Sequence, residues 1–465
     1  MPNPLLNATN VSIGDPQFTA LLTNLQGHIL KHHGRTHAHH IFVQFKPNKI
    51  AEAKNWIRNF ANTKIISALK QLRDAEKRRL DKTFDAGLFF NFSLSHSGYV
   101  ALGIPNPKIP NSDIAFTNGQ RTRENILNDN VNKWEAPFKK TIDALIIVSD
   151  NTDTIALSNR DLIINELKKF SIIIKKQKGK ILENAHGIGI EHFGYADGIS
   201  QPNFLKRPTP AVPPPTQWND DGAILNTLLV EEKGTNATDA FGSFYVFRKL
   251  EQNVKKFKTA ELILPVVRDN AGVVNIELAG AMLVGRFEDG TEVINHSKDQ
   301  GITVPSQLKN DFDYRTDAAN GSKCPFHAHI RVTNPRADVG QPFAKSVRLT
   351  RRGIPYNDIG RNEANLEGDQ PIKGVGLLFQ CYQSSIVSQF EFIQQKWANQ
   401  GDIGGTLVGQ DAIIGQGVNN TSKSLSSQWG IAPNNQSVPT KFSNFVKMKG
   451  GEYFFTPSIP FLSSI

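Results

Sequence analysis

An aspartate without a basic neighbour stands out in the segment FGYADGISQP, residues 193–202. Asp197 lies between Gly194 and Gly198, among apolar and aromatic residues. A carboxylate in such surroundings costs free energy unless another group pairs with it or a reaction uses it. Asp-Gly is also a common dipeptide of tight turns, so the segment alone is compatible with a simple turn. A functional interpretation therefore needs partner residues elsewhere in the chain.

Two later segments carry further reactive side chains. The first, CPFHAHIRVTNPR at residues 324–336, combines a cysteine, two histidines and two arginines. The second, RLTRRGIPY at residues 348–356, contains three arginines. A histidine can bind haem iron, an aspartate can transfer a proton and an arginine can stabilise an anion. These are the residue types that a haem peroxidase needs.

The motifs resemble those of the dye-decolorizing peroxidase family. They are Gly-x-x-Asp-Gly at 194–198, Ala-His-Ile-Arg with Asn-Pro-Arg at 328–336, and Arg-x-Gly-Ile-Pro-Tyr at 351–356. Flanking segments similar to the family are LQGHIL (25–30), GSFYVFRKL (242–250), GLLF (376–379) and GGEYFF (450–455). The resemblance keeps the family's order and spans nearly the whole chain.

This resemblance implies an enzyme with one haem b per chain. Such an enzyme reduces hydrogen peroxide and takes single electrons from bulky aromatic donors, such as anthraquinone dyes and phenols. A second hypothesis is a haem-binding or haem-delivery protein whose peroxidase activity is incidental. A third is a basic binding module without haem.

The axial ligand of the iron has three candidates. Neutral imidazole is a common ligand of haem iron, and a cysteine thiolate is another. The alternation over residues 327–332 predicts a strand on which His327 and His329 share a face, so the pattern does not choose between them. Cys324, followed by proline, is the third candidate. The resemblance places the ligand at His329.

The resemblance also assigns roles to a proximal acid and to the distal residues. Asp411 resembles the carboxylate that orients the second ring nitrogen of the axial histidine. Asp197 resembles the distal acid–base group that moves a proton between the peroxide oxygens. Arg351 resembles the distal cation that stabilises developing negative charge, and its motif selects it over Arg348 and Arg352. Without the resemblance, a surface salt bridge is the commoner role of an arginine.

Three more residues complete the predicted cofactor site. Arg336 is a candidate bidentate partner of a haem propionate. Leu377 and Phe379 alternate on a predicted strand and match the family's apolar pair in the distal pocket. The same two residues would serve equally well in a hydrophobic core.

A cluster of histidines near the N-terminus is a tempting but weak metal motif. No cysteine or Glu-x-x-His arrangement completes a known ligand set, so we interpret the cluster as a polar N-terminal segment. Its members are His28, His32, His33, His37, His39 and His40.

Composition sets broader limits. The chain has 465 residues, of which 39% are hydrophobic, and a net charge of +10. Two cysteines, Cys324 and Cys381, make no disulfide framework, and no signal peptide or membrane span is visible. We expect a cytoplasmic protein, with a processed secreted chain as the alternative, and no membrane partner.

The lysine-rich run at residues 168–180 lacks any nucleic-acid motif, so we expect no nucleic acid as a partner but an attraction for anionic substrates. The oligomeric state is not set by the sequence.

The element pattern predicts an α+β fold of two ferredoxin-like domains packed together, as the resemblance also implies. We place the domains at 1–217, with the distal motif, and 218–465, with the haem. Predicted strands cover 41–45, 88–94, 143–148, 244–248, 327–332 and 376–382. Predicted helices carry Ile50, Ala53, Ile57 and Phe60, then residues 161–170, and then Ile386, Phe390, Ile393 and Trp397 behind a Ser384 or Ser385 cap. Prolines between 208 and 215 predict a surface linker.

Overall fold

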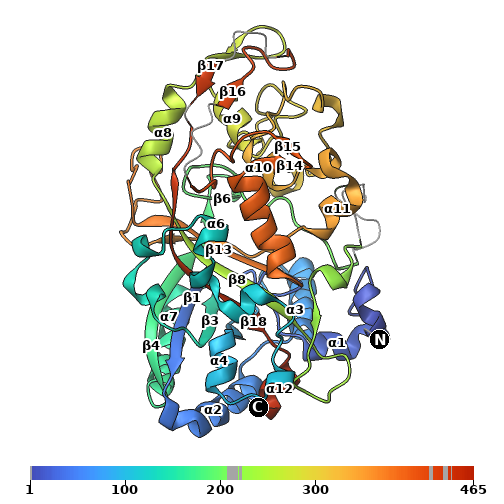
Figure 1. Cartoon of the computed structure of the whole chain (residues 1–465), viewed down its shortest axis with the longest axis vertical. Helices are drawn as coiled ribbons and strands as arrows, with labels where there is room; N and C mark the ends of the chain where they lie inside the picture. The colour runs from blue at the N-terminus through green and yellow to red at the C-terminus, as the bar shows by residue number, and fades with distance from the viewer. Residues whose placement is uncertain (1–2, 207–217, 219–221, 418–422, 433–437, 441) are drawn as a thin grey trace.

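A computed structural model describes residues 3–206, 218, 222–417, 423–432, 438–440 and 442–465. The prolines between 208 and 215 and the predicted boundary residue 217 lie outside the described residues. Among the described residues, ten strands form one antiparallel sheet in the order β11-β13-β8-β18-β2-β3-β1-β4, with β12 paired to β13 and β7 to β8. The N-terminal strands lie in the lower part of Figure 1, and α8–α11 lie in the upper part.

The N-terminal half of the sheet is a ferredoxin-like unit. Its elements are β1 (His37–Phe45), α2 (Ile50–Thr63), β2 (Phe89–Leu94), β3 (Ala144–Asp150), α7 (Asp153–Leu167) and β4 (Ser171–Lys180). Counted in chain order, its strands lie fourth, first, third, second across the sheet. The predicted helix over 161–170 begins earlier, at Asp153, because Thr152 is extended and starts the helix there. Every residue of β2 is buried, so both faces of this strand pack in the interior.

The C-terminal half repeats this order. Its elements are β8 (Phe241–Gln252), β11 (Thr350–Arg351) with β12 (Ile354–Asn357), β13 (Val375–Gln383), two π-helical segments (Ile386–Glu391 and Ile393–Asn399) and β18 (Val446–Thr456). The two halves meet where β18 pairs with β2 through Phe455 and Leu94. The α+β fold of two packed ferredoxin-like units is thus confirmed. The division at residues 217 and 218 stays a prediction.

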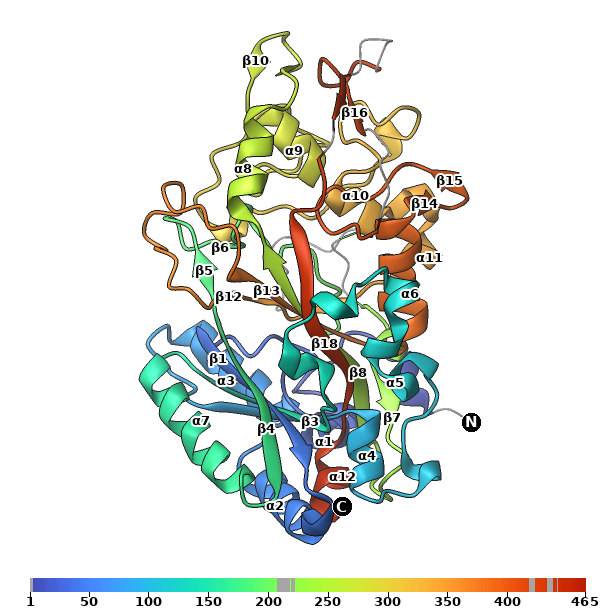
Figure 2. The ribbon, with the colours of Figure 1, turned by 60° about the vertical axis from the view of Figure 1, so that its left-hand side comes forward.

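The sheet curls so that its two ends approach each other. Gly179 of the edge strand β4 lies against Ile354 of β12 and Leu378 of β13, and a Cβ atom at Gly179 would come within 2.6 Å of the Ile354 side chain. Phe42 of β1 and Phe247 of β8 pack edge to face, 4.8 Å apart, in the core that this curvature encloses. Because glycine has no side chain, Gly179 lets the edge strand β4 approach β12 and β13 at the other end of the sheet (Figure 2).

Shorter elements surround the sheet. The helices are α1 (Thr19–Asn24), α3 (Ala68–Leu80), α4 (His96–Ala101), α5 (Ile114–Asn118), α6 (Glu124–Leu127), α8 (Val254–Leu262), α9 (Leu278–Val284), α10 (His329–Thr333), α11 (Gln341–Ser346) and α12 (Ile459–Ser464). The short strands are β5 (Leu182–Glu183), β6 (Gly189–Ile190), β7 (Val230–Glu231), β9 (Val267–Arg268), β10 (Val274–Asn275), β14 (Asp402–Ile403), β15 (Thr406–Leu407), β16 (Lys423–Leu425) and β17 (Val438–Thr440).

The prediction of a strand over 327–332 is wrong. Ala328 is extended, and its carbonyl accepts hydrogen bonds from the amides of Arg331 and Val332, so one turn of helix begins at His329. Asn334 and Pro335 end this turn, because proline excludes helical backbone before it. His327 and His329 therefore do not share the face of a strand.

Most of the N-terminal histidines, which we interpreted as a polar segment, are buried. His28, His33, His39 and His40 are each less than 5% exposed. Burial is the main cause that lowers the pKa of His32 to about 3 and of His40 to about 4. Within the described residues, no group of His, Cys, Asp or Glu side chains is arranged to hold a metal ion.

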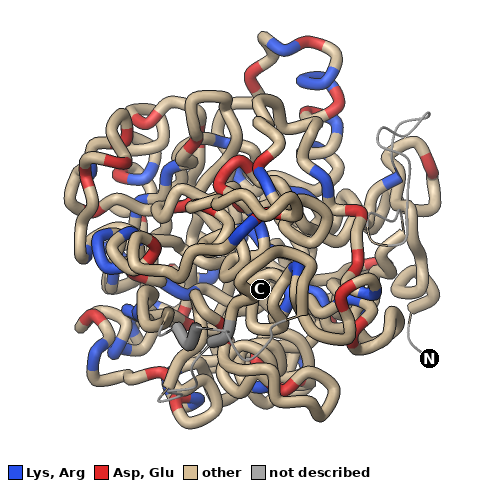
Figure 3. The backbone as a smooth tube through the Cα atoms, turned by 90° about the horizontal axis from the view of Figure 1, so that it is seen from above, with Lys and Arg blue, Asp and Glu red and all other residues tan. Residues whose placement is uncertain are grey.

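Three of the four lysines of β4 lie next to acidic side chains. Lys175 lies 2.8 Å from Glu135, Lys178 lies 2.6 Å from Asp153, and Lys180 pairs with Glu363. Figure 3 shows Lys and Arg interspersed with Asp and Glu along the backbone. The strand β4 therefore carries less unpaired positive charge than the sequence suggested, and its expected attraction for anionic substrates is weaker. No helix among the described residues is long and apolar enough to cross a membrane.

Candidate active site

One cavity collects most of the predicted site residues. It lies between the loop around Asp197, the helix α10 and the strands β11 and β13. Its lining includes Asp197, His329, Arg336, Arg351, Leu377 and Phe379. Asp411 contacts His329 from behind the lining. The sequence positions span more than 200 residues, so the fold has brought distant segments to one place.

His329 presents one ring nitrogen to the cavity. Its Nδ1 lies 2.8 Å from Oδ2 of Asp411, which leaves Nε2 for another partner. The other oxygen of the fully buried Asp411 accepts the amides of Ile413 and Ile414, at 2.7 and 2.8 Å. Burial opposes charge on both groups, yet their mutual attraction raises the pKa of His329 and lowers that of Asp411. An oriented histidine with a carboxylate partner is the arrangement typical of a metal ligand.

The alternatives to His329 lie elsewhere. His327 and Cys324 belong to the described part of the chain, and neither lines the cavity. Cys324 is fully buried among apolar side chains, and this burial raises the pKa of its thiol to about 12. Metal binding by cysteine requires the thiolate, which such surroundings disfavour.

Asp197 faces the cavity and follows the turn formed by residues 191–194, so it is not itself in the tight turn that Asp-Gly suggested. Gly194 and Gly198, with φ of 103° and 76°, adopt backbone conformations that favour glycine. The Asp197 amide donates to the Gly189 carbonyl at 3.0 Å, and Oδ1 accepts the Gly198 amide at 2.6 Å. The Glu191 carboxylate braces the same turn by accepting the amides of Phe193 and Tyr195.

Arg351 is the arginine of its motif that contacts Asp197. Its Nη1 lies 3.3 Å from Asp197 Oδ1, and its Nη2 donates to the Ser200 carbonyl at 3.0 Å. Arg348 also lines the cavity, whereas Arg352 turns into the interior. The structure thus joins the acid and the arginine that the motifs selected, across 154 positions of the chain.

Two further arginines, Arg336 and Arg286, add positive charge to the cavity. Arg336 donates to the carbonyl and side-chain oxygens of Asn310, at 2.8 and 2.7 Å, and to the Phe312 carbonyl. Arg286 donates to the carbonyls of Gly290 and Lys309, at 2.7 and 2.9 Å. These acceptors are uncharged, so they do not neutralise the positive charge of either guanidinium group. Burial lowers the pKa of Arg286 to about 10. Sequence reasoning missed Arg286, because a single arginine in VGRFEDG carries no motif.

An apolar wall closes the cavity on the side of the π-helical segments. Phe390, Ile393 and Trp397 line it together with Leu377 and Phe379. The sequence predicted the first three only as the buried face of a helix. They are buried as expected, but the wider π-helical turn supplies that face.

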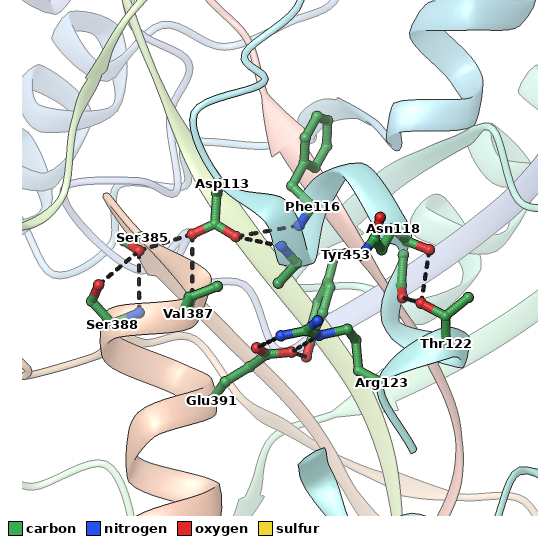
Figure 4. A network of polar contacts seen from close by, with 12 residues as sticks. Asp113, Phe116, Asn118, Thr122, Arg123, Ser385, Val387, Ser388, Glu391 and Tyr453 are labelled. Atoms are coloured by element: carbon green, nitrogen blue, oxygen red, sulfur yellow. Dashed lines mark hydrogen bonds and ion pairs between the residues drawn. The ribbon is translucent and has the colours of Figure 1, made fainter. Parts of the chain in front are cut away.

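Polar contacts fix this wall to the N-terminal half (Figure 4). Ser385 caps the first π-helical segment, and its hydroxyl donates to Asp113 at 2.8 Å. Further along, Glu391 accepts two hydrogen bonds from Arg123, at 2.9 and 2.6 Å, and one from the Tyr453 hydroxyl. The position of the wall is therefore set from outside the cavity.

These residues fit a haem. A macrocycle with an iron centre and two carboxylates needs an axial nitrogen, cationic partners for the carboxylates and apolar walls. His329 offers the nitrogen, Arg336 and Arg286 offer the cations, and the wall offers the apolar surface. Asp197 and Arg351 add a carboxylate and a guanidinium that contact each other at the same cavity.

Comparisons with known proteins show the family to which the chain is similar. The profile of the DyP dimeric alpha+beta barrel domain matches residues 24–181. The chain is 36% identical to the multifunctional dye peroxidase DyP2 of Amycolatopsis sp. over 491 residues, covering 100% of both chains. A crystal structure of a DyP-type peroxidase from Anabaena sp. superposes with a TM-score of 0.88 at 36% identity, covering 100% of this chain and 99% of the other. A dye-decolorizing peroxidase in complex with 2,6-dimethoxyphenol has a TM-score of 0.79 at 28% identity, covering 95% and 98%.

Proposed function

The chain belongs to the dye-decolorizing peroxidase family, and from this premise we propose how its own residues perform peroxidase chemistry. The proposal is that one haem b per chain occupies the cavity, that hydrogen peroxide is reduced there, and that bulky aromatic molecules supply electrons singly. The observation that carries it is the pair of contacts facing one cavity, His329 with Asp411 and Asp197 with Arg351.

His329 would bind the iron through Nε2, because Nδ1 is engaged by Asp411. Asp411 holds the ring in place and strengthens its donation to the metal. Arg336 and Arg286 would pair with the propionates, while Leu377 and Phe379 would exclude bulk water from the distal side. Bound haem would supply a redox centre that can give two electrons to peroxide and regain them one at a time from the aromatic donors.

Asp197 would transfer the proton. Its Oδ1 is engaged by the Gly198 amide and Arg351, which leaves Oδ2 to take a proton from one peroxide oxygen and return it to the departing one. Arg351 directs a fixed guanidinium at the same place, where it stabilises the negative charge of deprotonated peroxide. The Ser200 carbonyl holds that guanidinium in position.

The electron donors are proposed to be phenols and anthraquinone dyes. The match to a structure that contains 2,6-dimethoxyphenol supports the phenolic class, and the full-length match to a dye peroxidase supports the dyes.

Turnover of an anthraquinone dye by the purified haem protein tests the function. A Soret band together with dye oxidation far faster than that of free haem is the expected result. A rate near that of free haem would instead favour a haem carrier, and a protein without a Soret band would favour a binding module without haem.

A further inference from the structure

Arg352 directly follows Arg351, yet its side chain points away from the cavity into the protein. It is 6% exposed. Its Nε donates to the carbonyl of His28 at 2.7 Å, Nη2 to that of Ile29 at 2.8 Å, and Nη1 to that of Arg351 at 2.8 Å. Burial lowers the pKa of this guanidinium to about 10. A buried cation held by backbone carbonyls is costly, so a specific use is expected for it.

The carbonyls come from a loop with an unusual conformation. His28 has φ of 78°, a region that residues other than glycine rarely adopt. Gln71 of α3 holds this loop at both ends: its Oε1 accepts the His28 amide, and its Nε2 donates to the carbonyls of Lys31 and His32. Such strain persists only where the surroundings enforce it, and it is common near functional sites.

The same contacts fix the main chain of Arg351 on both sides. Its amide donates to Oε1 of Gln201 at 2.9 Å, and its carbonyl accepts Nη1 of Arg352. The next amide, that of Arg352, donates to the Gln380 carbonyl at 2.6 Å. Both peptide groups beside the Cα atom of Arg351 are therefore held, and this sets the direction in which its side chain leaves the backbone.

We propose that Arg352, clamped by the carbonyls of His28 and Ile29, is a positioning residue that aims Arg351 at the peroxide. The inference rests on the proposed role of Arg351. It gives the N-terminal loop a part in a site built mainly from the C-terminal half. Displacement of a reacting group by about 1 Å can lower a rate by about 100-fold, so a loosened Arg351 has a measurable effect.

Cyanide binding to the ferric haem protein tests the clamp without turnover, because cyanide is a distal ligand that Arg351 would stabilise. The dissociation constant is read from the Soret shift for Arg352→Met, Arg351→Leu and the double variant. We expect Arg352→Met to weaken cyanide binding by about tenfold and to add nothing in the Arg351→Leu background, since both changes would remove the same interaction. Arg352→Lys should lose less than Arg352→Met.

Arg35→Met is the matched control. Arg35 is also buried and donates to backbone carbonyls, those of His33 and Gly87, but it does not contact Arg351. It should bind cyanide like the wild type, whatever its loss of stability. If Arg352→Met does not fold, Arg352→Lys carries the same comparison.

Three results would overturn the clamp: unchanged cyanide affinity in the folded Arg352 variants, losses that multiply in the double variant, or equal weakening by Arg35→Met. Wild-type affinity in Arg351→Leu would instead refute the distal role of Arg351, and with it the premise of the clamp.

Discussion

At the scale of single residues, His329 lines the cavity and its neighbour His327 does not. His329→Ala should lose most of the haem, because Asp411 engages Nδ1 of His329 and Nε2 is left to bind the iron from the side of the cavity. His327→Ala should retain haem, since His327 does not line the cavity. The measurement is the ratio of Soret to protein absorbance after reconstitution. Equal losses in both variants, or loss in Cys324→Ala alone, would refute the assignment.

The two distal residues give a second prediction. Asp197→Asn should keep haem but slow the reaction with peroxide by about 100-fold or more, the typical effect of losing a proton-transfer group. Arg351→Leu should slow the same step, while electron transfer from dye stays close to wild type. Stopped-flow spectra with peroxide measure the rate. Asp161→Asn, on the exposed face of α7, is the control, and a full-rate Asp197→Asn would contradict the proton-transfer role.

The sequence could indicate a site residue only where that residue lies within a short local motif. Asp197, His329 and Arg351 each lie in a short motif, and the structure places all three on one cavity. Asp411 was identified through the resemblance alone, because its contact with His329 joins positions 82 apart. Arg286 has no motif, and its role depends on where the chain returns in space.

At the scale of elements, the sequence predicted long strands and helices better than short ones. The sheet strands and α2 appear where periodicity placed them, because many buried side chains enforce one pattern. The five residues of α10 are too few to show a period, and the flanking prolines and Ala328 decide their conformation. The π-helical segments keep the predicted buried face, since the side chains that pack on the sheet determine it.

The anchor of the π-helical wall gives a third prediction. Glu391→Gln should lower the free energy of unfolding by about 1–3 kcal/mol, because it removes the charge that pairs with Arg123 in a buried setting. Urea unfolding of the haem-free protein measures the change. Asp161→Asn breaks the exposed pair with Arg160 and should cost less than about 1 kcal/mol. Equal effects of the two changes would show that the anchor adds no stability beyond that of a surface pair.

At the scale of the whole molecule, each half supplies what the other lacks. The C-terminal half carries His329, Arg336 and Arg351, while residues before 206 supply Asp197 and, through Asp113 and Arg123, the support of the cavity wall. The chain end returns to the first half, where α12 packs near α2 in Figure 1. Unfolding of either half would therefore disturb the cavity.

The residue after β7, Glu232, is a buried acid with a consequence for pH. Glu232 accepts the amides of Gly234 and Ser458, which ties the start of the second half to the chain end. Burial raises the pKa of Glu232 from 4.5 to about 7. Because the folded state holds this proton more tightly than the unfolded state, the resulting stability is fully present below pH 4.5 and is lost as the pH rises through about 7.

We therefore expect wild-type protein to lose roughly 1–3 kcal/mol of unfolding free energy between about pH 5 and pH 8 through this one group. Glu232→Gln cannot titrate, so its stability should fall less over the same interval. Urea unfolding at the two pH values measures both slopes, and their difference removes the contribution of other titrating groups. Glu231→Gln, at the exposed neighbouring position, should keep the wild-type slope. Parallel curves for wild type and Glu232→Gln would show that the buried carboxyl does not couple folding to pH.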